Sequence, residues 1–354
     1  MRNRVIFLDY QVFVHRAGNA VWRVFDVRPE GDNLLCFDKK TKVVTKQTLP
    51  EIFDYLRNKN SSAHQSVRVW DTNDELVETI KFNDGMPINY TILNMIHGVL
   101  CKVGVDDFTT IILANDRGKS WRKKHEKAYK GDRAEKRALS GIDWKYIYDQ
   151  ANQLYEQLLE VTDFQPAFHF WFEDDPEAGR KRRWALEADD FMAAAPLYYT
   201  NSDIILVTID ADLEQLFLYN YDDTKGNVYI FSPHQAHLGK NVPYKPILDK
   251  TTCFKLLSKK IEKEASDNLT TEVCTDEAYE TREEIVSLLH LPQWIKDIAF
   301  KTFSTYEPKL TDIDSIPFKS IRSKWDNIYK TDKILTYEYC QQLREKRNKR
   351  KKKK

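Results

Sequence analysis

The chain has 354 residues, which predicts about two domains, or one large domain with an appendage. With 42% hydrophobic, 31% charged and 12% aromatic residues, it has the composition of a folded protein, which excludes a wholly disordered chain. No run reaches the roughly 18 apolar residues of a membrane helix, and the apolar stretch near Met1 is too short for a signal peptide. A membrane-spanning or secreted protein is therefore not expected.

The charge is distributed unevenly, although it sums to only +1. Residues 117–137 contain ten Lys and Arg against three Asp and Glu, a net charge of +7, and residues 343–354 contain nine against one, a net charge of +8. The rest of the chain therefore carries −14. Two basic segments on an acidic remainder indicate a polyanionic partner. A solvated helix face and a frayed tail are the alternative, but Trp121 and Tyr129 interrupt the first segment.

The cysteines point to a reducing compartment. They are odd in number, form no C-x-x-C pair and match no zinc-site spacing. The simplest interpretation is free thiols in the cytoplasm, at Cys36, Cys101, Cys253, Cys274 and Cys340.

The predicted elements alternate between strands and helices. Residues 4–8 predict a strand, and residues 109–114 and 203–209 are the near-continuous apolar runs of strands buried on both faces of a parallel sheet. Apolar residues recur at helical spacing over residues 88–102, 144–161 and 186–198. This alternation predicts an α/β fold, with a central, mostly parallel twisted sheet and helices on both faces.

Residues 26–87 interrupt this rhythm and predict a β-rich insertion. Residues 25–33 are rich in turn formers and predict a turn region. Two hairpins are expected after it, one from residues 34–37 and 42–45, the other from residues 66–70 and 76–82. From residue 252 onward the pattern is mostly helical, with a helix over residues 285–291 that ends at Pro292.

An aspartate follows each of the three predicted core strands at once. These are Asp9, Asp116 and Asp210, and Asp212 accompanies the last. One such aspartate is more often a helix cap. Three at the carboxyl edge of one parallel sheet, where ligands bind in open α/β folds, indicate a site. Because Asp210 and Asp212 are spaced by two, their side chains would point the same way in an extended segment.

A second acidic group opens the predicted helix over residues 186–198. Glu187 and Asp190 share a helix face, with Asp189 beside them. One acid would complement the helix dipole, but three acids in four residues repel one another unless a cation lies between them. Oxygen ligands without His or Cys suit Mg²⁺ or Mn²⁺. Two such ions about 4 Å apart are a general device for in-line attack on a phosphodiester.

Two segments before this helix allow more than one interpretation. The aromatic side chains of Phe168, Phe170, Trp171 and Phe172 favour a place in the core over a base-stacking platform. The basic run Arg180–Arg183 fits a second DNA contact and a solvated loop equally well.

Four segments follow one another in a characteristic order. They are residues 7–17 (FLDYQVFVHRA), residues 115–124 with 129–133 (NDRGKSWRKK and YKGDR), residues 187–190 (EADD) and residues 210–216 (DADLEQL). In this order they resemble the flap endonuclease/5′→3′ exonuclease family, which has a PIN-like fold. The closest likeness is to its bacteriophage members of the 5′-exonuclease and ribonuclease H type. The resemblance covers roughly residues 4–24 and 88–303.

The resemblance implies a role for each of these positions. Asp9, Asp116, Glu187, Asp189 and Asp190 would hold the first of two Mg²⁺ or Mn²⁺ ions or its waters, and Asp210 and Asp212 would serve the second. Lys130 and Arg133 would lie at the base of a helical arch and polarise the scissile phosphate, and count with Asp9 and Asp116 as catalytic. Besides Lys130 and Arg133, the implied nucleic-acid contacts are Trp121, Arg122, Lys123, Lys124, Tyr129 and Arg137.

The later part of the chain departs from the family. A Gly-Asp-x-Ser-Asp-Asn segment usually supplies two more aspartates, and its counterpart is residues 263–268, where Asp267 matches and Glu264 stands in for the first aspartate. Most members then have a glycine-rich helix-hairpin-helix that grips duplex DNA, whereas residues 269–277 contain no glycine. Residues 282–292 resemble the phage type, in which that motif is modified.

The expected organisation follows from the elements and the resemblance together. An α/β nuclease core would span residues 1–250, with the insertion at 26–87 and the arch region at about 117–150. A helical DNA-binding subdomain would span residues 251–340, and a disordered basic tail residues 341–354. The implied partners are DNA with 5′ ends or flaps, an RNA–DNA hybrid, and replication proteins such as a clamp or a single-strand-binding protein. A monomer in the cytoplasm, or in the host cytoplasm for a phage protein, is implied.

Three functions remain open. The first is a metal-dependent 5′-nuclease that removes primers or flaps in replication. The second is a PIN-type ribonuclease, which shares the sheet and the acids but is generally smaller and lacks the arch base. The third is a non-catalytic DNA-binding or replisome-scaffold protein. Such a protein could lose its carboxylates freely, whereas all seven of the best-matched ones are present in this chain.

Overall fold

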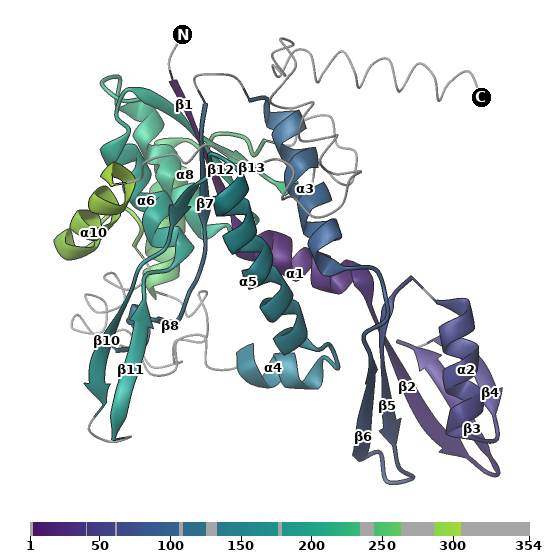
Figure 1. Cartoon of the computed structure of the whole chain (residues 1–354). Coiled ribbons are helices and arrows are strands. Elements are labelled where there is room, and N and C mark those ends of the chain that lie inside the picture. Colours follow the sequence, from purple (N-terminus) through teal and green to yellow (C-terminus); the bar gives the residue numbers. More distant parts are fainter. Residues whose placement is uncertain are drawn as a thin grey trace, which may run out of the picture. The chain divides into compact units, whose positions relative to one another are not determined.

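The structure is a computed structural model, and it describes residues 3–39, 41–60, 62–105, 109–124, 133–175, 179–233, 244–262 and 287–305 (Figure 1). The chain divides into two compact units. Unit 1 comprises Met1–Val12, Ile96–Gly131 and Gln157–Lys354, and unit 2 comprises Phe13–Met95 and Asp132–Glu156.

A five-stranded, all-parallel sheet organises unit 1. Its order is β13-β12-β1-β7-β9, with β1 (Asn3–Asp9) at the centre between β12 (Ser202–Val207) and β7 (Thr109–Ala114). The edge strands are β13 (Val228–Phe231) and β9 (Gln165–Ala167). The predicted α/β class and its three core strands are therefore confirmed, although β12 ends two residues earlier than expected.

Alternate residues of these strands share one core with the helices of unit 1. Val5 and Phe7 of β1 pack with residues of α6 (Ala188–Tyr198), the 3-10 helix η2 (Asp212–Tyr221), α8 (Lys250–Glu262) and α10 (Gln293–Ser304). The intervening Ile6 and Leu8 are also fully buried. Both faces of β1 are thus covered, as the continuous apolar run predicts. Burial of each such side chain contributes about 1.5–3 kcal/mol.

Three helices contribute residues to both units. They are α1 (Tyr10–Val21), α3 (Ile88–Val103) and α5 (Trp144–Val161). The helices predicted over residues 88–102 and 144–161 are thereby confirmed, and the one predicted over 186–198 forms as α6. Within the described residues, no helix has the length and apolar character needed to cross a membrane. Cys36, Cys101 and Cys253 are free thiols, as predicted, and Cys274 and Cys340 lie outside the described residues.

Unit 2 contains a second five-stranded sheet, of order β4-β3-β2-β5-β6. Its strands are β2 (Trp22–Glu30), β3 (Asn33–Asp38), β4 (Thr41–Lys46), β5 (His64–Trp70) and β6 (Leu76–Phe82). Both predicted hairpins form, as the antiparallel pairs β3–β4 and β5–β6. Helix α2 (Leu49–Lys59) packs Ile52 and Leu56 against this sheet.

The turn region predicted over residues 25–33 is wrong for most of its length. Residues up to Glu30 belong to β2, and the chain turns only after it, where Gly31 has a φ of 60°. Turn-forming residues misled the prediction. Pro29 is tolerated because pairing of β2 with β5 ends at Val27, so beyond that point β2 has a neighbour on one side only.

A short three-stranded sheet and a helix boundary also differ from expectation. Arg180–Arg183 belong to β11 (Arg180–Ala185), which pairs with β10 (Phe170–Asp175) and with the two-residue strand β8 (Lys119–Ser120), so they are not a loop. Residues 287–291 are not helical, and residues 285 and 286 lie outside the described part. Pro292 instead precedes α10 as its N-cap, because proline suits the start of a helix better than its end.

Replacing Gly226 with alanine is expected to destabilise unit 1 by about 3 kcal/mol or more. A Cβ at Gly226 would lie 1.8 Å from the backbone oxygen of Ser202, so the start of β12 would have to shift. Urea unfolding measures the effect. Gly98→Ala is the control, because Gly98 lies in α3 with open space at its Cβ and alanine favours helix. Equal stability of the two variants would contradict the prediction.

Candidate functional site

Three aspartates lie together at the carboxyl ends of the three central strands of unit 1. Asp9 is the last residue of β1, while Asp116 and Asp210 follow β7 and β12 by a few residues. The negative charges of Asp116 and Asp210 both act on the carboxyl group of Asp9. The parallel register of the strands produces this convergence, because it brings their carboxyl ends to one edge of the sheet.

Asp9 is a buried acid in an electronegative place. Burial, and then the charge of Asp116, raise the pKa of Asp9 to about 7, with a further contribution from Asp210. Two hydrogen bonds oppose this rise: Oδ2 accepts one from Thr208 Oγ1 at 3.1 Å, and Oδ1 accepts a longer one from Val12 N at 3.4 Å. The carboxylate form of Asp9 would therefore be favoured by a cation at this edge.

Asp116 joins the edge of the sheet to the first turn of α6. Its side chain is exposed, and its Oδ1 accepts a hydrogen bond from Ala188 N at 2.7 Å. Ala188 is the first residue of α6, whose free amides and dipole favour a negative charge. The helix thus fixes Asp116 beside the acidic residues that open it.

Asp210 and Asp212 do not lie on an extended segment, so the premise of their predicted common direction is wrong. Asp210 Oδ1 accepts a hydrogen bond from Asp212 N at 2.8 Å, a local turn that starts the 3-10 helix η2. Asp210 N donates to Thr208 Oγ1 at 3.1 Å. Both carboxyl groups are half-buried, and Thr208 links Asp210 to Asp9.

The cation expected among the acids of the α6 turn is Arg122. Its guanidinium donates from Nη1 to Glu187 Oε2 at 2.6 Å and from Nη2 to Asp190 Oδ1 at 2.7 Å. Arg122 is 2% exposed and Trp121 is 1% exposed. Direct contact with nucleic acid, as predicted for both residues, is not compatible with this burial.

Asp190 is held on both of its oxygens. Oδ2 accepts hydrogen bonds from Trp121 Nε1 at 2.9 Å and from Glu187 N at 2.8 Å, while Oδ1 accepts from Arg122. Since the side chain is fully buried, its contacts assign it to positioning α6 rather than to the predicted ligand set. Asp189, by contrast, is half-buried at the start of α6.

The side-chain oxygens of these acids are the ligand type that hard divalent cations prefer. Within the described ranges, no three Asp, Glu, His or Cys side chains are gathered tightly enough to hold an ion directly. Mg²⁺ commonly keeps several waters and takes one or two carboxylates. An all-oxygen set around Asp9, Asp116 and Asp210 suits such an ion, whose charge would oppose the burial and the neighbouring carboxylates that raise the pKa of Asp9.

The remaining predicted contacts fall in different places. Lys123 is half-buried, and Lys124 is ion-paired with Glu173 while its Nζ lies 5.3 Å from the ring centroids of Trp171 and Trp184. Arg133 is the first residue of α4 (Arg133–Leu139). Five predictions lie outside the described residues: Tyr129, Lys130, Glu264, Asp267 and the tail 341–354.

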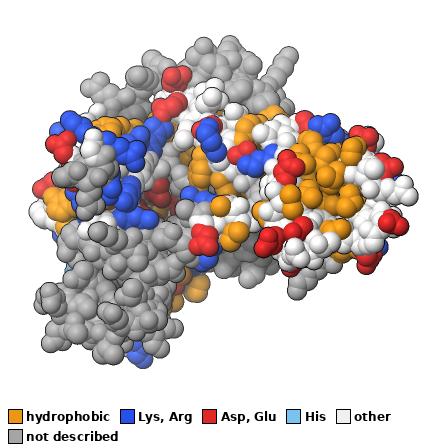
Figure 2. All heavy atoms as spheres, turned by 90° about the horizontal axis from the view of Figure 1, so that it is seen from below, with side chains coloured by type: hydrophobic (Ala, Val, Ile, Leu, Met, Phe, Trp, Pro, Cys, Tyr) orange, Lys and Arg blue, Asp and Glu red, His pale blue; other side chains and the backbone are white. Residues whose placement is uncertain are grey.

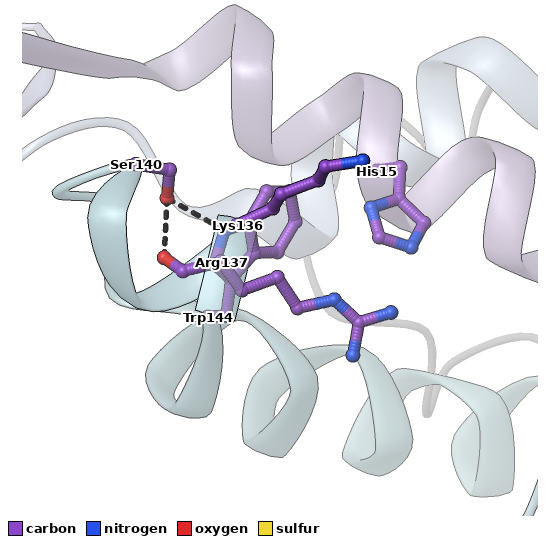
Figure 3. Close-up of a pocket in the computed structure, with 5 residues that line it drawn as sticks. All are labelled: His15, Lys136, Arg137, Ser140 and Trp144. Atoms are coloured by element: carbon purple, nitrogen blue, oxygen red, sulfur yellow. Dashed lines mark hydrogen bonds between the residues drawn. The ribbon is translucent and has the colours of Figure 1, made fainter. Parts of the chain in front are cut away.

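Arg137 lines a separate pocket within unit 2. The pocket has a volume of about 290 Å³ and is lined by His15, Lys136, Arg137, Ser140 and Trp144, which come from α1, α4, the residue after α4 and the start of α5 (Figure 3). Ser140 Oγ holds its rim together, donating to Arg137 O at 2.7 Å and accepting from Trp144 Nε1 at 3.0 Å. The ring of His15 lies 4.9 Å from that of Trp144.

Sequence reasoning missed three polar residues that support the acids. Thr208 binds Asp9 and Asp210, and Gln11 Nε2 donates to the fully buried Asn115 Oδ1 at 2.8 Å, next to Asp116. Each stands within two residues of a predicted acid, and that adjacency was the available signal. Compared with models of known protein families and with curated proteins, the chain matches none of them.

Proposed function

We propose that the chain is a divalent-metal-dependent 5′-nuclease of PIN-like fold, which hydrolyses phosphodiesters of DNA or of an RNA–DNA hybrid. One observation carries this proposal: Asp9, Asp116 and Asp210 lie together at the carboxyl edge of the central parallel sheet. An all-carboxylate group on such an edge suits Mg²⁺ or Mn²⁺. The chain also has a strongly basic segment, at residues 117–137. Cleavage of a phosphodiester uses both features, carboxylates to hold the metal ions and cations to bind the phosphates.

Some residues of the site would bind the metal ions, and others position those ligands. Asp9 and Asp116 would serve a first ion with Asp189, and Asp210 and Asp212 a second. Glu187 stands at the edge of this group, tied to Arg122, and Thr208 orients Asp9. Two bound ions supply an activated water and stabilise the leaving oxygen.

The basic segment would bind and orient the substrate. From the resemblance, Lys130 and Arg133 would contact the scissile phosphate, since a point charge and a guanidinium fork stabilise the charge that develops there. Lys123 and Lys124 would lie along the strand that leads to it. The proposed setting is removal of primers or flaps in replication, by a monomer in the cytoplasm that has a helical C-terminal subdomain.

The direct test is cleavage of a labelled 5′-flap duplex with Mg²⁺ or Mn²⁺, compared with EDTA. We expect cutting near the junction, lost in EDTA and reduced at least 100-fold in Asp116→Asn and in Asp189→Asn. Asp149→Asn is the matched control, because Asp149 is an acid on the surface of α5 that pairs only locally with Lys145. Its cleavage should equal that of the wild type.

The same experiment separates the alternatives. Tight binding without cleavage by the wild type would favour a DNA-binding scaffold. Metal-dependent cleavage confined to single-stranded RNA would favour a PIN-type ribonuclease. Equal activity of Asp116→Asn and the wild type would contradict the proposed site itself.

A further inference from the structure

The β10–β11 hairpin carries a row of aromatic rings on one of its faces, which we call the Phe170 face. Phe170 and Phe172 alternate along β10, so their side chains lie on the same side of the strand, and the ring of Phe168, which precedes β10, continues the row. The ring centroids are 6.4 Å apart for Phe168 and Phe170, which are stacked, and 5.9 Å apart for Phe170 and Phe172. Phe172 is 57% exposed and Phe170 is exposed as well, so for these two rings the predicted place in the core is wrong, whereas Trp171 packs against the core of unit 1.

Arginine side chains lie over these rings. The guanidinium of Arg183 is 4.1 Å from the ring centroid of Phe170, and that of Arg117 is 4.5 Å from the centroid of Phe168. Arg183 lies opposite Phe172 in the register, and its Nη2 donates to Arg117 O at 2.6 Å. Among the described residues, no carboxylate lies within ion-pair distance of Arg183. Rings and cations therefore share one surface.

One further cation extends this surface along β11. Lys181 is exposed on the same face as Arg183, two residues away along the strand. The exposed Arg180 and Lys119 fall on the opposite face, where Lys119 lies over the ring of Trp184. Figure 2 shows Lys and Arg side chains gathering, with hydrophobic side chains among them, on the side where Figure 1 places the hairpin. Acids of β10 offset part of the charge at the outer end, where Asp174 lies opposite Lys181.

The Phe170 face leads directly to the acidic site. Arg117 follows Asp116 in the chain, and β11 runs into Glu187 at the start of α6. At about 3.3 Å per residue, Arg183 lies at most about 13 Å along the chain from Glu187.

We propose that the Phe170 face binds a single-stranded segment of nucleic acid, with a base stacked on Phe172 and phosphates on Arg183 and Lys181. Unpaired bases expose the flat faces that aromatic rings stack on, whereas bases in a duplex are already stacked on one another. The cations supply the sequence-independent attraction to phosphates. As a substrate contact the proposal rests on the nuclease function, but binding itself does not depend on cleavage.

The test measures binding of a fluorescent 20-nucleotide oligo(dT) and of a blunt duplex in EDTA, where cleavage is absent. Phe172→Ala should bind oligo(dT) about tenfold more weakly, within the range found for removal of one stacking side chain, and should bind the duplex unchanged. Phe172→Trp should retain wild-type affinity, because it keeps a ring. Phe254→Ala is the matched control, since Phe254 lies on α8 and is 55% exposed.

The charges are tested through the dependence on salt. The double variant Lys181→Gln/Arg183→Gln should lower the slope of log affinity against log salt by about 1.4, since each single-strand phosphate contact contributes about 0.7. Arg57→Gln, an exposed arginine of α2, should leave the slope unchanged. Oligo(dT) affinity that is unaffected by Phe172→Ala would overturn the inference, and the exposed rings would then fit a protein partner better.

The two proposals fail in different ways. Oligo(dT) binding that depends on Phe172, without metal-dependent cleavage by the wild type, would remove the nuclease function and leave the Phe170 face standing. Normal flap cleavage, with oligo(dT) binding and cleavage unchanged in Phe172→Ala, would remove the Phe170 face and leave the nuclease function standing.

Discussion

Replacing Arg122 with methionine is expected to lower the free energy of unfolding by about 3–5 kcal/mol. Arg122 is the cation that both Glu187 and Asp190 contact, and all three side chains are buried. Removing one partner of a buried ion pair leaves charge that neither water nor another group compensates. Two acids would be left in this state, so the loss falls at the upper end for single substitutions.

Urea unfolding measures this effect, and Lys123→Met provides the control for the loss of one positive charge in the next residue. The triple variant Arg122→Met/Glu187→Gln/Asp190→Asn should recover much of the loss, because it removes the uncompensated acids too. The defect of Arg122→Met should also be smaller at pH 5 than at pH 8. Without Arg122, burial would penalise the ionised form of Glu187 and Asp190 but not the protonated form. The folded variant is therefore destabilised further as these acids ionise with rising pH. If Arg122→Met proved as stable as Lys123→Met, Arg122 would not be the residue that compensates the buried acids.

Replacing Asp9 with asparagine is expected to stabilise the metal-free protein at pH 8 while abolishing cleavage. Burial and the charge of Asp116 raise the pKa of Asp9 to about 7, from an ordinary value of 3.8. An acid with a raised pKa contributes stability at low pH, and that contribution is lost as pH rises through 4 to 7. The neutral amide escapes this loss, which is worth about 2–4 kcal/mol at most.

Thermal unfolding in EDTA at pH 5 and pH 8 measures this difference. The gain of Asp9→Asn over the wild type should be less than half as large at pH 5 as at pH 8, and Asp149→Asn should show no such trend. Added Mg²⁺ should raise the melting temperature of the wild type more than that of Asp9→Asn, because binding to the folded state alone stabilises it. A difference between variant and wild type that does not change with pH would contradict the raised pKa.

Local pattern was enough to predict the frame of unit 1. The β-branched apolar runs at residues 4–8 and 109–114 strongly favour strands in the interior of a sheet, and they form β1 and β7. The helical spacing of apolar residues over 144–161 matches α5 at both ends. Acids placed immediately after buried strands could be found for the same reason. Parallel strands share one carboxyl edge, so position along a strand translates into position in space.

Pairing between distant residues could not be predicted in this way. Arg122 reaches Glu187 and Asp190 over 65 and 68 positions, and nothing in the basic run 117–137 distinguishes it from its neighbours. The β10–β11 hairpin was missed because its strands lack alternation of apolar and polar residues, with aromatic and basic side chains instead sharing its faces. Helix α2 shows a signal that was overlooked: Thr48 and Glu51 form a capping box, with Pro50 between them.

The central strand of unit 1 has a consequence for biosynthesis. Asp9 and its partner Thr208 are 199 positions apart, and β1 pairs with β12 over the same separation. On the ribosome, β1 is made first, and its neighbours β7 and β12 follow only after about 100 and about 200 further residues, whereas the sheet of unit 2 is complete by Phe82. Pairings so far apart in sequence form slowly and leave strand edges open to wrong partners. The acidic site therefore comes into being late, only after most of the chain has been translated.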